Sequence, residues 1–179
     1  MIRTILVNIL RRFEKRYNYD AAYIHDLLTA SPRAFWALQG ARTLASYQAG
    51  APPVALAAAG LAATLSEDCG PCVQIGVRMA EENGVPADVL RAILAGDTTG
   101  MGADAALAYQ FAKASLNKDL DRADPLREAV LAQWGGQGLS AIALAIAASR
   151  VYPTIKYAMG HGKACSRVQV GDDLVAVRT

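Results

Sequence analysis

The sequence is poor in aromatic residues and in net charge, and each shortage narrows the class of protein. Aromatic residues make up 7% of the 179 positions although 53% are hydrophobic, because alanine supplies much of the apolar share. Small apolar side chains let helices approach closely, which favours a compact helical protein with room for buried subunit contacts. The net charge of +2 is too small to indicate a nucleic-acid partner.

Long apolar runs are also lacking. The N-terminal run, residues 5–10, is shorter than the core of a signal peptide and leads into Arg11 and Arg12 without a small-residue cleavage site. The later runs VALAAAGLAATLS and LSAIALAIAAS fall below the roughly 20 residues of a membrane span. We therefore expect a cytoplasmic protein with no membrane partner. In that compartment a close cysteine pair is more often catalytic or metal-binding than a structural disulfide.

Helical periodicity covers almost the whole chain, and the strand-like pattern is confined to the tail SRVQVGDDLVAVRT. Ser31 is a predicted N-cap with Pro32 at the first helical position, and Gly84 is a predicted helix stop. A helix is expected to start at Asp124 and Pro125 and to end at WGGQG. A second one starts near Leu139, with a kink at Pro153. The other helices are predicted at about 2–16, 20–29, 53–65, 85–96 and 103–117. One all-α domain, residues 1–179, is the prediction.

Two of the three cysteines, Cys69 and Cys72, enclose Gly70 and Pro71 in the stretch SEDCGPCVQIG. Pro71 suits the first turn of a helix, which puts Cys72 in that turn and Cys69 just outside it. The positive end of a helix dipole favours a thiolate, and the thiolate is the nucleophile. Cysteines three positions apart can close a small disulfide ring, so redox chemistry is the favoured interpretation over two inert thiols.

Two other interpretations of the pair are weaker. Structural zinc takes four ligands, and the remaining candidates, Cys165, His25 and His161, stand at no familiar spacing. The letters CGPC and the later YPTIK also resemble thioredoxin. However, the pair follows a helix-forming segment here, not a buried strand, and YPTIK lies about twice too far along the chain. We expect neither a metal nor an organic cofactor.

The order of elements resembles another family. A helix, a short turn, CxxC at the start of a second helix and then GVPADVLRAILAGD, AYQFAKA and AIALAIAASRVYPTIKYAMG are similar to the carboxymuconolactone decarboxylase superfamily, specifically its AhpD-like alkylhydroperoxidase branch. The likeness covers about residues 30–162. It implies an all-α fold assembled as trimers or hexamers. It also implies a dithiol that reduces peroxides and is re-reduced by a thiol partner, such as a lipoylated or thioredoxin-like protein.

The chain departs from this family at the proton relay. The family motif has a His four positions after the second Cys and a Glu twelve positions before the first; here those positions are Gly76 and Ala57. Glu67, Asp68 and His25 are the candidate substitutes. An adjacent carboxylate alone would raise a thiol pKa. A slower peroxidase, another relay, or disulfide substrates would each account for the difference.

The predicted function is therefore a thiol-dependent peroxidase or thiol-disulfide oxidoreductase. Cys72 is the activated thiol and Cys69 its resolving partner. The alternative is a non-enzymatic, homo-oligomeric relative that keeps the pair as a redox sensor or for packing. His25 and His161 are otherwise expected to be structural, His161 at a helix C-terminus, and Cys165 is expected to be a buried residue more than a third redox partner.

Overall fold

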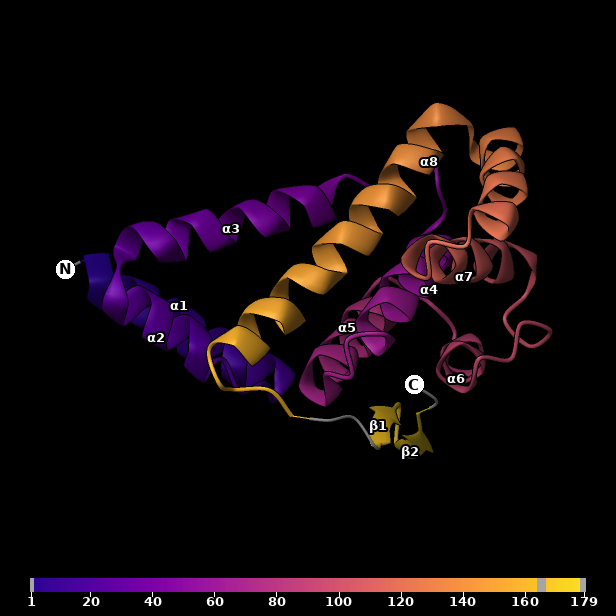
Figure 1. Ribbon diagram of the computed structural model, residues 1–179. Coiled ribbons are helices and arrows are strands. Elements are labelled where there is room, and N and C mark those ends of the chain that lie inside the picture. Colours follow the sequence, from indigo (N-terminus) through magenta and orange to yellow (C-terminus); the bar gives the residue numbers. More distant parts are fainter. Residues whose placement is uncertain (1, 164–166, 178–179) are drawn as a thin grey trace.

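The computed structural model describes residues 2–163 and 167–177, and these form eight helices and two short strands (Figure 1). In chain order they are α1 (Ile2–Tyr17), α2 (Ala22–Ala30), α3 (Pro32–Ser46), α4 (Pro53–Leu65), α5 (Gly70–Glu82), α6 (Ala87–Ala95), α7 (Ala103–Leu116), α8 (Leu120–Ala158), β1 (Arg167–Val170) and β2 (Asp173–Ala176). The predicted all-α class is confirmed, and the strand-like tail forms an antiparallel hairpin.

The local signals at helix ends act as the sequence predicts. Ser31 caps α3, its hydroxyl accepting a hydrogen bond from the Ala34 amide at 3.4 Å, and Pro32 is the first helical residue. Asn83 closes α5, and Gly84 follows with a positive φ of 78°. Short-range chemistry is therefore sufficient to set these boundaries.

The prediction for residues 120–158 is wrong in two respects. The helix begins at Leu120, capped by the Asp119 side chain, so Pro125 lies inside it instead of opening it. Pro153 lies in a helical segment without the predicted kink, whereas the helix end predicted at WGGQG is confirmed, because Gly135 has a φ of 66° and a ψ of −173°, which are not helical. Glycine adopts this conformation without the steric cost that other residues meet, so two helical segments meet there at an angle.

Two hydrophobic clusters hold the helices together. The larger one joins α4–α8 and the hairpin, with fully buried side chains such as Leu90, Ile93 and Ile142. The smaller one joins α1, α2 and α3 to the C-terminal end of α8 through Tyr23, Leu28 and their neighbours. Figure 1 shows the consequence: α8 runs diagonally between the α1–α3 group and the α4–α7 group. The end of α8 therefore lies where the two clusters meet.

Two helices carry apolar surface that this chain leaves partly uncovered. On α1, Leu6 and Leu10 are buried, but Ile5 and Ile9 of the predicted apolar face are 57% and 53% exposed. By length and composition alone, α8 could also cross a membrane, and 28% of its most apolar window is buried within this chain. The helix breaks at Gly135 and carries Arg150 and Lys156, and charged residues inside a membrane are costly.

Candidate redox site

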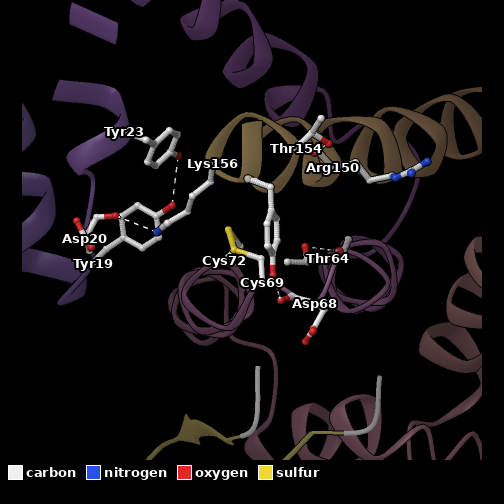
Figure 2. Close-up of a disulfide and its surroundings, with 12 residues drawn as sticks. Tyr19, Asp20, Tyr23, Thr64, Asp68, Cys69, Cys72, Arg150, Thr154 and Lys156 are labelled. Carbon is white, nitrogen blue, oxygen red and sulfur yellow. Dashed lines mark hydrogen bonds between the residues drawn. A yellow bond between two sulfur atoms is a disulfide. The ribbon is translucent and has the colours of Figure 1, made fainter. Parts of the chain in front are cut away.

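The cysteine pair lies where the sequence predicts, at the N-terminus of α5. Cys69 is the N-cap residue and Cys72 is the third residue of the helix, with their Cα atoms 5.2 Å apart. The structure joins the two in a disulfide (Figure 2). Pro71 is accommodated because the first-turn amide that it lacks would have no partner within the helix.

The chain reaches this position through a tight turn after α4. Asp68 has a φ of 47°, and its amide donates a hydrogen bond to the carbonyl of Leu65. Cys69 then adopts an extended conformation and accepts the first helical hydrogen bond, from the Val73 amide at 2.9 Å. The turn therefore reverses the chain between α4 and α5 and places both cysteines at the buried start of α5.

Both cysteines are buried, though not equally. Cys69 is fully buried, whereas Cys72 keeps 5% of its surface exposed. Attack on an external substrate requires an approach to one sulfur. Of the two residues, Cys72 is the one with exposed surface.

Hydrogen bonds and one ion pair form a closed circuit around the pair. The Tyr157 hydroxyl donates to the Asp68 carbonyl at 2.7 Å, and the Gly70 amide donates to the Lys163 carbonyl at 3.0 Å. The circuit closes through Asp20, whose carbonyl accepts from Lys156 Nζ and whose carboxylate pairs with Lys163 Nζ, each at 3.1 Å. We name this circuit the contact ring; its members are Asp20, Asp68, Gly70, Lys156, Tyr157 and Lys163.

The end of α8 is shaped so that the contact ring can close. Gly160 has a φ of 79°, its amide bonds to the Tyr157 carbonyl, and the His161 amide bonds to the Lys156 carbonyl at 2.9 Å. This is the Schellman pattern of helix termination. It turns the chain so that Lys163 reaches the start of α5. His161 is at a helix C-terminus, as predicted, and its Nε2 also lies 2.8 Å from Asp26 Oδ2.

Lys156 is the unusual member of the contact ring because its side chain is fully buried. Its ammonium group lies 4.5 Å from the ring centroid of Tyr19 and 5.4 Å from that of Tyr23, within the range of cation–π attraction. Burial lowers the pKa of Lys156, against an opposing effect of Asp20. Burial likewise raises the pKa of Tyr19 and of Tyr23, so both phenols stay protonated.

The three candidate relay residues have different surroundings. Glu67 pairs with Arg150 Nε of α8, and Asp68 contributes its backbone carbonyl to the contact ring. His25 lies on α2, where its Nε2 is 3.2 Å from Glu14 Oε2 of α1. The structure therefore brings Glu67 and Asp68 to the turn before the pair. The contact that it records for His25 is with the N-terminal helix.

The two positions at which the AhpD-like family has its relay residues border an open space in this chain. Gly76 and Ala57 both line a cavity of about 200 Å³ that also touches Gly60 and Thr64. Since residues four apart share a face of a helix, this cavity begins one turn along α5 from Cys72. A Cβ added at Gly76 would come within 3.1 Å of Leu61 Cδ2. We name this cavity the hollow; its lining is mostly alanine, glycine, leucine and other apolar residues.

Sequence reasoning missed Lys156, Tyr157 and Lys163. A signal for Lys156 was present, since it and Arg150 are the two cations in the otherwise apolar stretch AIALAIAASRVYPTIKYAMG. Nothing local pointed to Lys163, because its role depends on how the chain turns after α8. The predicted residue Cys165 lies outside the described residues. Within the described ranges, His, Cys, Asp and Glu form no group of three that could hold a metal ion.

Comparison with known proteins adds no family to this description. This chain matches no protein-family model, no curated protein and no solved structure.

Proposed function

We propose that this chain is a thiol-dependent peroxidase in which Cys69 and Cys72 alternate between a dithiol and a disulfide. The observation that carries the proposal is the Cys69–Cys72 disulfide at the N-terminus of α5. A helix N-terminus favours a thiolate in the first turn, and Cys72 occupies that turn. The likeness to AhpD-like alkylhydroperoxidases supports the same chemistry and a homo-oligomeric, cytoplasmic protein.

The chemistry balances with a peroxide and a dithiol. The Cys72 thiolate attacks one peroxide oxygen, the O–O bond breaks, and the departing alkoxide takes a proton to become an alcohol. Cys72 is left as a sulfenic acid, which condenses with the Cys69 thiol to form the disulfide and water. An external dithiol, free or carried by a lipoylated or thioredoxin-like protein, then reduces the disulfide and is itself oxidised.

Burial of the pair favours a small oxidant. With Cys69 fully buried and Cys72 at 5% exposure, a peroxide has easier access to the sulfur than a folded protein disulfide has. Exchange with disulfides is the second outcome that the same assay detects. The third is a pair that is oxidised once without turnover, as expected of a redox sensor or a packing element.

Steady-state peroxide consumption with a small dithiol tests the proposal. Cys72→Ser is expected to abolish turnover, Cys69→Ser to stop it after one oxidation, and Cys165→Ser to retain it as the matched cysteine control. Unchanged turnover in Cys72→Ser would contradict the proposal. Turnover of a disulfide but not of a peroxide would replace it with an exchange function.

A further inference from the structure

The buried Lys156 ammonium of the contact ring forms no ion pair with a carboxylate among the described residues. The Asp20 carboxylate is paired with Lys163 and also accepts a hydrogen bond from the Ala22 amide. Lys156 instead contacts the Asp20 carbonyl and two aromatic rings. Among the described residues, no carboxylate lies within ion-pair distance of the Lys156 ammonium group. Burying a charge without an anion is costly, so this ammonium is poised to stabilise any anion that forms beside it.

The contact ring links Lys156 to the residues on either side of Cys69. Tyr157, next to Lys156 in the chain, bonds the residue that precedes Cys69, and Lys163 bonds the residue that follows it. Both connections return to Asp20, which Lys156 also contacts. Figure 2 shows Lys156 and Tyr19 on one side of the disulfide, with Thr64 and Asp68 on the other.

We propose that the Lys156 ammonium group lies close enough to Cys72 to stabilise the Cys72 thiolate when the pair is reduced. The inference rests on the proposed function, because it requires that the disulfide open. On reduction by an external dithiol, two electrons break the S–S bond. One proton goes to Cys69, and the other is released to solvent while Cys72 remains a thiolate beside the Lys156 ammonium. Lys156 thereby supplies the stabilisation of the thiolate that Gly76 and Ala57 cannot supply.

Other ionisable groups lie around the Lys156 ammonium and the Cys72 thiolate. Glu67, Arg150 and Asp68 lie on the α4 and α8 sides, and the Glu67 carboxylate is occupied by Arg150. Asp20 and Lys163 neutralise each other on the loop side. The phenols of Tyr19, Tyr23 and Tyr152 stay neutral because burial raises each pKa. Of the groups named here, Lys156 is the cation without a carboxylate partner.

Titration of the Cys72 thiolate by its ultraviolet absorbance tests the proposal, in a background of Cys69→Ser and Cys165→Ser. An opposite charge at close range changes a pKa by about one to three units. Lys156→Met is therefore expected to raise the Cys72 pKa by about one unit or more. Lys156→Arg should restore the lower value, and Lys113→Met on α7, the matched loss of one lysine charge, should leave it unchanged. A purely structural role would not move this pKa selectively.

Two results would overturn the proposal. One is a Cys72 pKa that is the same in Lys156→Met and in its parent. The other needs no variant at Lys156 and decides the question if Lys156→Met fails to fold: a Cys72 pKa at or above about 8.5, the ordinary thiol value, in the parent itself. Neither result depends on peroxide. Absence of turnover in the wild-type protein would count against the proposed function and leave the thiolate titration to be judged separately.

Discussion

The N-terminus of α5 and the helical turn that follows it are built in opposite ways. Beside Cys69 and Cys72, the Lys156 side chain is fully buried against the rings of Tyr19 and Tyr23, and the contact ring links it to Asp68. One turn along, the hollow is lined by Ala57, Gly60 and Gly76 and leaves about 200 Å³ empty. The first region is filled and polar, whereas the second is open and mostly apolar.

This contrast indicates where the chemistry of the pair can come from. A proton relay needs groups that gain and lose protons within hydrogen-bond reach. The hollow has none of the His or Glu side chains that the family resemblance leads one to expect, because Gly76 and Ala57 occupy those positions. The contact ring has Lys156. The two regions should therefore respond differently to mutation.

Tyr23→Ala should cause the largest change, because it empties the filled region. Tyr23 is 1% exposed, and its hydroxyl accepts from Tyr19 at 3.2 Å. Truncating a buried aromatic side chain costs about 3–5 kcal/mol. Urea unfolding should show a loss in this range, whereas Ala57→Leu, which adds volume to the hollow, should change stability by no more than about 1 kcal/mol. Equal losses in the two variants would show that the two regions are packed alike.

The difference between these regions also explains how much of the structure could be predicted from the sequence. Local signals such as Ser31, Gly84 and the CGPC spacing predict helix boundaries and the position of the pair, because their physics acts over a few residues. The contact ring joins Asp20, Asp68 and Lys163, which are up to 143 residues apart. No periodicity in the sequence predicts contacts between residues so far apart. The start of α8 at Leu120 was missed for the opposite reason, since Asp124–Pro125 is a local start signal that the longer helix overrides.

Gly76→His combined with Ala57→Glu should produce the next largest change, because it places a relay in the hollow. General acid–base groups typically contribute about a hundredfold or more to rate. Peroxide turnover is expected to rise by about a hundredfold, through protonation of the leaving alkoxide. Gly76→Ala with Ala57→Gln is the matched control, because it adds side chains without a titratable group. A rise in the control as well would trace the effect to packing, and no rise in either would show that the contact ring already supplies the proton.

The buried Lys156 of the filled region should also change how stability depends on pH in alkaline solution. Burial gives Lys156 a folded pKa below its ordinary 10.5, so between these two values the unfolded state binds more protons than the folded state. Stability therefore rises with pH across that window. In the oxidised protein, the wild type should gain stability relative to Lys156→Met as pH rises toward 10.5. Unfolding curves measured at several pH values check this, and parallel pH profiles would contradict it.

Lys163→Met should have the smallest effect, because it removes the exposed edge of the contact ring. The side chains of Lys163 and Asp20 are 63% and 45% exposed, and ion pairs of this kind contribute no more than about 1 kcal/mol.

The pKa of Asp20 is lowered by the Ala22 amide first and by Lys163 second. The contribution is therefore present above the ordinary Asp pKa of 3.8 and is lost as pH falls through the folded value. Wild type and variant should differ slightly at neutral pH and converge in acid. A loss well above 1 kcal/mol would mean that the segment after α8 belongs to the filled region and that the hydrogen bond from Gly70 depends on the lysine side chain.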